Sequence, residues 1–220
     1  MDGARPDLIC VSHLWWNSVW QRPHQLLSRL ARRYRVLWVE EPHIEVGSPA
    51  DEFVVTEERP NLSVARLVYR GDEATFRRWY DEKLERIGAR RMTMPDGLRE
   101  TNLLFGSPVQ ARLERDLLTY VAPRRRGPMV LWLYTPMAAQ FIDLLAPELV
   151  IYDVMDDLGA FEYAPPDLVQ RREALLARAD LVFAGGPSLH AAARAHRPDA
   201  HLFPSGVEQR HFARALEEDL

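Results

Sequence analysis

The sequence has little of what marks secreted and membrane-spanning proteins. Cys10 is the single cysteine, so it cannot form an internal disulfide, and its place in an apolar run predicts a small core residue in a reducing compartment. Residues 1–5 lack the basic and then apolar plan of a signal peptide, and no apolar run approaches the roughly 18 residues needed to span a bilayer. These absences predict a cytoplasmic protein, with peripheral contact at the inner membrane face left open.

A strong charge of one sign and several nucleotide-binding motifs are also missing. The 28 Lys and Arg residues nearly balance the 32 Asp and Glu residues, for a formal net charge of −4, so no nucleic-acid partner is expected. The first loop has no Gly-x-Gly-x-x-Gly, which disfavours a nicotinamide or flavin dehydrogenase because glycine lets the backbone approach a pyrophosphate. The chain has no Walker motif, zinc-type histidine spacing or Gly-x-Ser-x-Gly elbow, and we assign no metal ligand.

Apolar strand patterns alternate with helical patterns along most of the chain. An apolar fraction of 47% supports a packed core, and 220 residues suffice for one large domain covering residues 1–220. Residues 8–13 and 35–40 are predicted strands on either side of a helix that opens at Pro23, which indicates a parallel β-α-β unit. The alternation predicts an α/β fold with a doubly wound, mostly parallel open sheet, and residues 71–128 are predicted to be a helical insertion. Further strands are predicted at residues 53–56, 62–68, 129–134 and 149–153, and two strand-turn-helix units at residues 179–188 and 201–208.

The first loop of such a sheet is unusually aromatic. In open α/β sheets ligands bind beyond the carboxyl ends of the strands, and residues 12–22 follow the first predicted strand. Trp15 and Trp16 are candidate platforms for a sugar ring, and Arg22, beside a helix start, is a candidate contact for a phosphate or hydroxyl group. The alternative is that Trp15, Trp16 and Trp20 form a small satellite core and that Arg22 caps a neighbouring carbonyl.

Titratable side chains gather at the other predicted strand ends. His13 ends the first strand and is the best-placed imidazole for catalysis, although a lone histidine is more often structural. Asp156 and Asp157 follow the strand at residues 149–153 and could bind a metal, act as a base or orient an acceptor hydroxyl. The alternative is that they are solvated and that Asp153 caps local backbone. The remaining candidate substrate-binding residues are Tyr134 and Thr135.

Small residues at the two terminal strand-turn-helix units predict an anion site. Tight turns at helix starts expose backbone N–H groups and the positive end of the helix dipole. Pro187 suits a first helical position, and Ser188 or Ser205 could cap a helix. The candidate phosphate- or nucleotide-binding residues are Gly185, Gly186, Ser188, Ser205 and Gly206.

Taken together, these motifs resemble those of GT-B glycosyltransferases of the GT4-like kind. The resemblance rests on Ser-His-x-x-Trp-x-x-x-Trp-Gln-Arg-Pro at residues 12–23, Tyr-Thr-Pro-Met at 134–137, Tyr-Asp-x-Met-Asp-Asp at 152–157 and Pro-Ser-Gly-Val-Glu at 204–208. It is similar to a bacterial subgroup whose first loop carries Trp-Gln-Arg-Pro. That subgroup continues with Gln-His, whereas this chain has His24-Gln25, which moves the imidazole about 100° around a helix.

The resemblance implies a Rossmann-like GT-B amino-terminal domain that forms the acceptor-side half of a glycosyltransferase. It implies transfer of a sugar from a nucleotide-sugar co-substrate, a UDP- or GDP-sugar, to a glycan or lipid-linked acceptor such as a cell-envelope polysaccharide. In that family a carboxyl-terminal domain holds the donor through two glutamates eight positions apart, and no two glutamates of this chain have that spacing. We therefore expect transfer to require a donor-binding domain in cis or in trans. A non-catalytic binding or scaffold module and a sugar-nucleotide epimerase-like enzyme remain the alternatives.

Overall fold

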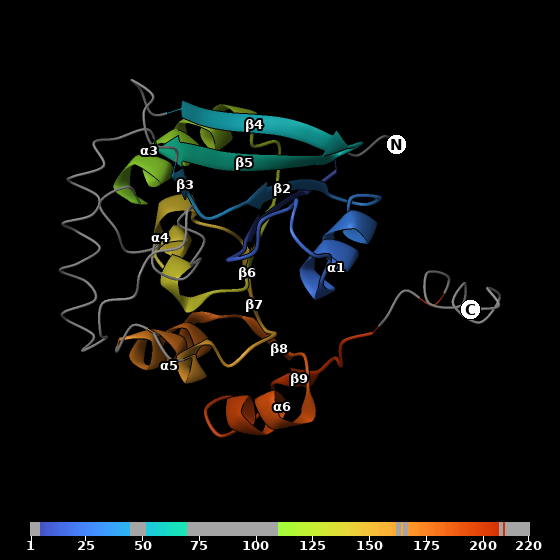
Figure 1. The fold of residues 1–220 in the computed structure, drawn as a ribbon, viewed down its shortest axis with the longest axis vertical. Coiled ribbons are helices and arrows are strands. Elements are labelled where there is room, and N and C mark those ends of the chain that lie inside the picture. Colours follow the sequence, from blue (N-terminus) through green and yellow to red (C-terminus); the bar gives the residue numbers. More distant parts are fainter. Residues whose placement is uncertain are drawn as a thin grey trace, which may run out of the picture.

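The computed structural model describes residues 5–44, 52–69, 110–161, 164, 167–206 and 209. Within these ranges the chain forms one sheet of nine strands in the order β3-β5-β2-β1-β6-β7-β8-β9, with β4 paired to β5 (Figure 1). Every neighbouring pair is parallel except β4 with β5, so the predicted α/β fold with a mostly parallel open sheet is confirmed. The strands are β1 (Asp7–Val11), β2 (Arg35–Val39), β3 (His43–Ile44), β4 (Glu52–Arg59), β5 (Leu62–Tyr69), β6 (Met129–Leu133), β7 (Leu149–Val154), β8 (Leu181–Ala184) and β9 (His201–Leu202).

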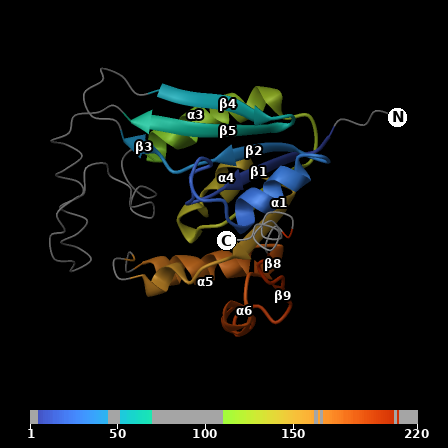
Figure 2. The same cartoon turned by 45° about the vertical axis from the view of Figure 1, so that its right-hand side comes forward.

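The sheet grows in two directions from β1. The predicted β-α-β unit is present: helix α1 (Arg22–Leu30) connects β1 to β2, and the two strands pair in parallel from Asp7 with Arg35 to Val11 with Val39. The chain then builds the β2–β5 side, and later returns to place β6 on the other edge of β1. Figure 2 shows the resulting order, with β4 and β5 at one end of the sheet and β8 and β9 at the other. The strand order therefore reverses between β1 and β6.

The β4–β5 hairpin is the one antiparallel pair among the described strands. The predicted turn around Arg59-Pro60-Asn61 is observed, and Asn61 has a φ of 63°. Asparagine tolerates this left-handed conformation better than most side chains, which explains its place at the tip of the hairpin. The hairpin adds β4 to an otherwise parallel sheet and shields one side of β5.

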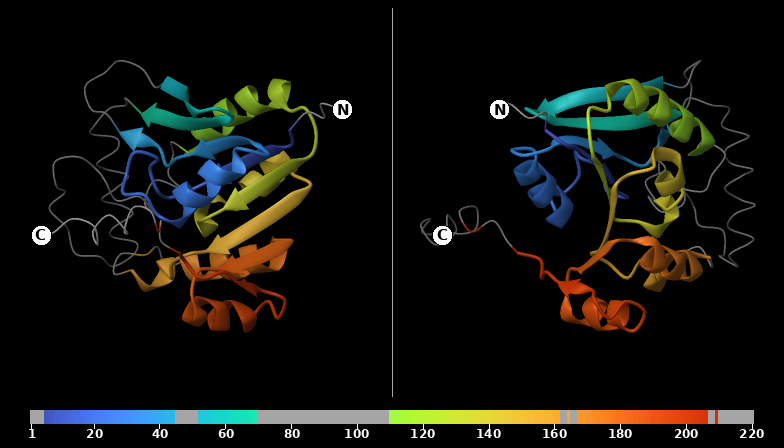
Figure 3. Two further views of the ribbon diagram at one scale, coloured as in Figure 1. Left: turned by 90° about the vertical axis from the view of Figure 1, so that its right-hand side faces the viewer. Right: turned by 180° about the vertical axis from the view of Figure 1, so that it is seen from behind.

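The helices cover both faces of the sheet. In the right-hand view of Figure 3, α1 in blue lies on one face, while the green, yellow and orange helices α3, α4 and α5 lie on the other. The helices on the second face and at the end of the sheet are α3 (Gln110–Val121), α4 (Phe141–Leu145), α5 (Leu168–Arg178) and α6 (Pro187–Arg194), with short 3-10 turns η2 (Ala122–Arg124), η3 (Pro136–Ala138) and η4 (Leu158–Ala160). None of the helices in the described ranges is long and apolar enough to cross a membrane.

Each face has its own apolar core. On the α1 face, Leu27 packs with Trp38 and with Cys10, which is fully buried as predicted. On the opposite face, Leu113 and Leu117 of α3 are fully buried among the strands. The described end of the predicted insertion is therefore an integral layer of the domain, whereas residues 71–109 lie outside the described residues.

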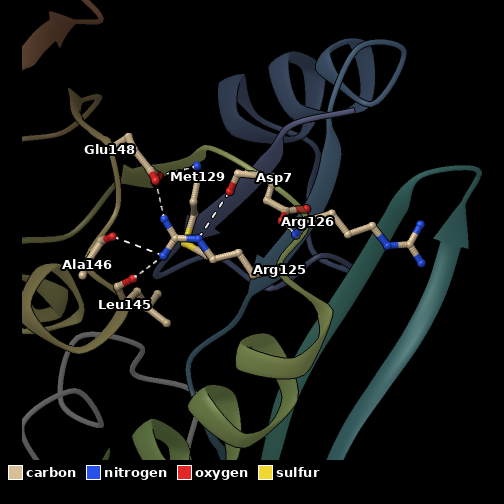
Figure 4. A network of polar contacts seen from close by, with 8 residues as sticks. Asp7, Arg125, Arg126, Met129, Leu145, Ala146 and Glu148 are labelled. Carbon is tan, nitrogen blue, oxygen red and sulfur yellow. Dashed lines mark hydrogen bonds and ion pairs between the residues drawn. The ribbon is translucent and has the colours of Figure 1, made fainter. Parts of the chain in front are cut away.

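A network of polar contacts joins two connections at the amino edge of the sheet, where the parallel strands begin. Figure 4 shows the guanidinium of Arg125 donating to the carbonyls of Leu145 and Ala146 and, at 2.5 Å, to Glu148. Glu148 in turn accepts from the backbone N–H of Met129 at 2.6 Å. These contacts tie the chain before β6 to the chain before β7, so that the two strands start in register.

The terminal helices begin close to the predicted positions. Pro187 is the first residue of α6, but the N-cap is Gly186, which has an extended backbone and no side-chain cap. The expectation that Ser188 caps this helix is therefore wrong, because Ser188 lies inside its first turn. The described part of α5 begins at Leu168, and the helix start predicted after Gly206 lies outside the described residues.

Candidate functional site

The candidate residues lie at the carboxyl edge of the sheet, at and beside the point where the strand order reverses. His13 follows β1, Tyr134 follows β6, Asp153 and Asp156 lie at and after the end of β7, and Gly185 follows β8. In the left-hand view of Figure 3 the arrowheads of β6 and β7 point to this common edge. Parallel strands bring these otherwise distant side chains together, as the sheet topology requires.

His13 and Asp156 face each other across the β1 and β7 loops. The imidazole Nε2 lies 3.8 Å from Oδ2 of Asp156; the histidine side chain is 6% exposed and the aspartate side chain 40% exposed. Burial lowers the pKa of His13 to about 4, so the ring is neutral near neutral pH and the pair is not an ion pair there. Burial also raises the pKa of Asp156. A neutral imidazole beside a half-exposed carboxylate can orient a hydroxyl group and accept its proton.

Arg22 is held by a buried carboxylate. Its Nε donates to Oδ2 of Asp153 at 3.1 Å and its Nη2 lies 3.1 Å from Oδ1, so the two planar groups meet side by side. Nη1 donates to the backbone carbonyl of Phe203, after β9. The Asp153 side chain is fully buried, and this burial raises its pKa although the guanidinium acts in the opposite direction. Because these contacts occupy all three nitrogens, Arg22 has little capacity left for a phosphate.

Tyr134 and Thr135 are interior residues. The Tyr134 ring is 2% exposed and lies stacked against Trp132 at a centroid distance of 6.3 Å, while its hydroxyl faces Asp153 and lowers the pKa of that carboxyl. Thr135 is fully buried, and its hydroxyl accepts from the backbone N–H of Met137 at 3.3 Å to cap η3. Because both side chains are buried, they favour a supporting role in the site over direct contact with a substrate. Their predicted contact with substrate stays a prediction.

The tryptophans of the first loop divide between core and surface. Trp16 is 4% exposed and packs against Trp38, with ring centroids 5.4 Å apart. Its burial agrees with the alternative interpretation, in which this tryptophan is a core residue and not a platform for a sugar ring. Trp15 is half-buried. Trp20 is 40% exposed, and the guanidinium of Arg59 lies 4.7 Å from its ring centroid. The ring of His24 is also stacked on Trp20, at a centroid distance of 5.7 Å, so the faces of Trp20 are in contact with Arg59 and His24. Trp15 is therefore the remaining candidate for an aromatic platform.

His24 and Glu40 hold this loop, a role that the sequence did not reveal. The backbone N–H of Gln21 donates to Nδ1 of His24 at 3.1 Å, so Nε2 carries the proton and donates to the carbonyl of Trp15 at 3.1 Å. Glu40 is buried at the end of β2, accepts from the backbone N–H of Trp16 and lies 3.3 Å from Nε of Arg66. An acidic residue directly after a buried strand was the available signal, but only the fold shows which loop it reaches.

Asp157 is held by a different partner from that of Asp156. Oδ1 of Asp157 accepts from Nη1 of Arg172 at 3.0 Å, which directs this carboxylate toward α5.

The loops after β8 and β9 lie in contact with each other. A Cβ at Gly185 would lie 3.5 Å from the Ser205 hydroxyl, and the N–H of Gly185 donates to the carbonyl of Val154. The two terminal units thus meet, and Ser205 also donates its backbone N–H to the carbonyl of Gly185 at 3.1 Å. Gly186, Ser188 and Gly206 lie on the accessible side of this junction.

The described residues do not include a ready-made metal centre. No group of three or more His, Cys, Asp or Glu side chains in the described ranges is placed to hold a metal ion. Asp153 is committed to Arg22, and Asp157 to Arg172, so the three aspartates of residues 153–157 do not converge.

No family model matches this sequence, and no curated protein matches it. Solved structures match its fold. One from E. coli, named for trehalose-6-phosphate and bound with UDP-2-fluoro glucose, has a TM-score of 0.56 and 15% identity over 97% of this chain and 52% of that chain. An α,α-trehalose-phosphate synthase (UDP-forming) from Burkholderia xenovorans in complex with glucose-6-phosphate has a TM-score of 0.57 and 15% identity over 96% of this chain and 52% of that chain. The corresponding synthase from Burkholderia vietnamiensis has a TM-score of 0.57 and 14% identity over 96% and 51%.

These matches show the fold. The chain spans about half the length of the structures that it matches, since each match covers 51% or 52% of the other chain. The chain has the Rossmann-like fold of a GT-B domain, as the motif resemblance implied. The GT4-like subgroup stays a prediction.

Proposed function

We propose that this chain is the acceptor-side half of a GT-B glycosyltransferase. In the reaction the bond from the sugar to the nucleoside diphosphate breaks, the diphosphate leaves with the bonding electron pair, and a bond forms from the sugar to an acceptor oxygen, whose hydroxyl proton is released. The supporting observation is a GT-B fold that aligns over nearly all of this chain but only half of two UDP-forming synthases, with His13 and Asp156 paired at its carboxyl edge. Transfer then needs a donor-binding half, in cis or in trans, because positioning of both substrates supplies much of the rate.

The donor is proposed to be a nucleotide-sugar, with UDP-sugars first to be tested and GDP-sugars second. The acceptor is proposed to be a glycan or lipid-linked glycan, and the enzyme to belong to the GT4-like subgroup on the strength of its first-loop motif. The exposed side of the loops after β8 and β9, at Gly186, Ser188 and Gly206, is the proposed contact for the donor phosphates.

Asp156 is proposed to orient the acceptor hydroxyl and His13 to contact the same group. His13 is neutral near neutral pH, so it can either donate or accept a hydrogen bond there. Trp15 is proposed to offer the apolar face on which the acceptor sugar stacks. Asp157 is proposed to be structural because Arg172 already holds it, which makes it the matched control for Asp156.

The test uses the native gene product, whose intact mass is first compared with the 25.4 kDa of this chain. Transfer of labelled sugar from UDP- and GDP-sugars to cell glycans and lipid-linked glycans is then measured. Asp156→Asn is expected to lower the transfer rate by roughly 100-fold, the effect of losing an oriented contact at the reacting group, while donor binding is unchanged. Asp157→Asn is expected to transfer at nearly the wild-type rate.

Each outcome bears on one part of the proposal. Full-rate transfer by the 220-residue chain alone would contradict the need for a donor-binding half. Equal losses in the Asp156 and Asp157 variants would contradict the assignment of the acceptor site to the His13–Asp156 pair. A native product that transfers sugar from no nucleotide-sugar would contradict the glycosyltransferase function itself.

A further inference from the structure

A second concave site lies at the amino edge of the sheet, away from His13 and Asp156. It is a pocket of about 210 Å³ between the starts of β1 and β2, the β4–β5 turn, and the end of α3 with η2. Its apolar floor includes Ile9, Leu37 and Val121. The volume is below the roughly 300 Å³ at which pockets for drug-sized ligands begin, so the pocket suits a small metabolite.

Arg35 and Arg124 supply positive charge at one wall of this pocket. Nη2 of Arg35 pairs with Asp7 and also donates to the carbonyl of Arg124 at 2.8 Å, which fixes the guanidinium in place. Its Nε is buried and has no hydrogen-bond partner among the described residues, and the side chain as a whole is 31% exposed. Arg124 lies over the ring of Tyr120, 4.2 Å from the centroid, and pairs with no carboxylate in the described ranges. Nη1 of Arg124 also donates to the carbonyl of Tyr120 at 3.0 Å, which holds this guanidinium beside that of Arg35. Two guanidinium groups fixed side by side form a typical phosphate contact.

The surrounding edge reinforces the positive field. The connections at this edge carry the exposed residues Arg5, Arg32 and Arg33. Arg125, in contrast, is occupied by Glu148 and two backbone carbonyls and contributes no free charge (Figure 4). Clustered charge of one sign raises the local concentration of an oppositely charged ligand, even in a chain whose net charge is negative.

The β4–β5 side of the pocket has acceptors and neutral polar groups. Glu57 and Ser63 are cross-strand neighbours on β4 and β5, and Asn61 lies in the turn between these strands. Glu57 is exposed and has no ion-pair partner among the described residues. A bare phosphate would be repelled by this carboxylate, whereas hydroxyl groups would donate to it and to the carbonyl oxygen of the Asn61 side chain.

We propose that this pocket binds a small phosphorylated sugar or polyol, with its phosphate against Arg35 and Arg124 and its hydroxyls against Glu57 and Asn61. A ligand of this class offers a phosphate to the arginines and hydroxyl groups to the acceptors, and its size matches the volume of the pocket. The site is separate from the proposed transfer site, so it stands or falls independently of the glycosyltransferase function. It lies on the connections before β1, β2 and β6, at the edge of the sheet opposite to His13 and Asp156.

The test is a titration of the isotopically labelled chain followed by NMR. The probes are glucose 6-phosphate, mannose 6-phosphate and glycerol 3-phosphate, with glucose and inorganic phosphate as the two separate halves. At least one phosphorylated probe is expected to shift the backbone amides of Asn61 and Ser63, and to bind at least tenfold more tightly than either half alone. Shifts at Gly185 and Ser205 instead would report binding at the carboxyl edge.

Three variants separate the two walls. Arg124→Gln is expected to weaken binding of the phosphorylated probe roughly tenfold, the effect of losing one charge-assisted contact. Arg126 is an exposed neighbour outside the lining residues, and Arg126→Gln is expected to leave the affinity unchanged within twofold. Glu57→Gln is expected to weaken binding of the phosphorylated probe, because its hydroxyl groups lose a charged acceptor. The affinity for inorganic phosphate is expected to stay unchanged or to rise, because a repulsive charge is removed.

The outcomes decide the proposal. It is overturned if none of the three phosphorylated probes shifts Asn61 and Ser63, or if Arg124→Gln and Arg126→Gln have the same effect. Equal affinity for inorganic phosphate and for the best phosphorylated probe would identify an adventitious ion only. An unchanged affinity in Glu57→Gln would refute the role given to the hydroxyl groups.

Discussion

At the scale of single residues, burial decides the charge of His13. The side chain is 6% exposed, and desolvation outweighs a favourable hydrogen bond with the backbone of Tyr134, so the pKa falls to about 4 from 6.5. The unfolded chain binds a proton at this residue throughout the interval between those two values, whereas the folded chain does not. The contribution of neutral His13 to stability is complete above pH 6.5 and is lost as the pH falls toward 4.

A pH series on His13→Gln tests this linkage. Between pH about 7 and about 5 the free energy of unfolding of the wild type is expected to fall by about 2 kcal/mol more than that of the variant, because the variant has no imidazole to charge at this position. Urea unfolding at several pH values measures the difference. His196→Gln, at an exposed site after α6, is the control and is expected to retain the wild-type slope. Parallel slopes for wild type and His13→Gln would contradict the low pKa.

At the scale of elements, backbone conformation sets how α4 ends. Ala146 is its C-cap and has φ 44° and ψ 62°, a left-handed conformation in which the Cβ of an L-residue is crowded. Glycine removes this crowding, so Ala146→Gly is expected to stabilise the protein by about 0.5–1 kcal/mol. The matched change Ala191→Gly, at an exposed position inside α6, is expected to destabilise it by about 0.5–1 kcal/mol. Thermal unfolding of both variants checks the opposite signs, and a loss in both would contradict the strain at Ala146.

At the scale of the whole molecule, the Arg22–Asp153 pair joins segments that are far apart in the chain. The two residues are separated by 131 positions, and the same guanidinium reaches the backbone at Phe203, so one side chain ties α1 to β7 and to the chain after β9. Both side chains are buried, at 9% and 0% exposure. Removing one partner would leave an uncompensated charge in the interior.

Arg22→Met is therefore expected to lower the free energy of unfolding by about 3–5 kcal/mol. The double variant Arg22→Met with Asp153→Asn is expected to recover part of this loss, because no buried charge remains. Arg171→Met is the control: it breaks an exposed ion pair with Asp167 and is expected to lower the free energy of unfolding by less than about 1 kcal/mol. Denaturant unfolding compares the three, and a small effect of Arg22→Met would show that the pair does not bind the segments together.

Local patterns in the sequence determined the architecture of this protein. The apolar runs of β1, β2, β6 and β7 and the helix start at Pro23 appear in the structure where they were predicted, because alternation of buried strands and amphipathic helices is a short-range signal. The same reasoning placed the candidate loops at one edge, since parallel strands end together.

Only the tertiary structure decided which side chains are available at that edge. Arg22 and Trp16 had the residue types of a phosphate contact and a sugar platform, yet Asp153 occupies the first and Trp38 packs against the second. Asp156 and Asp157 are adjacent in sequence, but one faces His13 and the other Arg172. Each outcome depends on partners more than ten positions away, whose distance and burial no local pattern contains. A sequence can therefore specify where a strand ends, while the competition between distant partners for a side chain is resolved only by the folded chain.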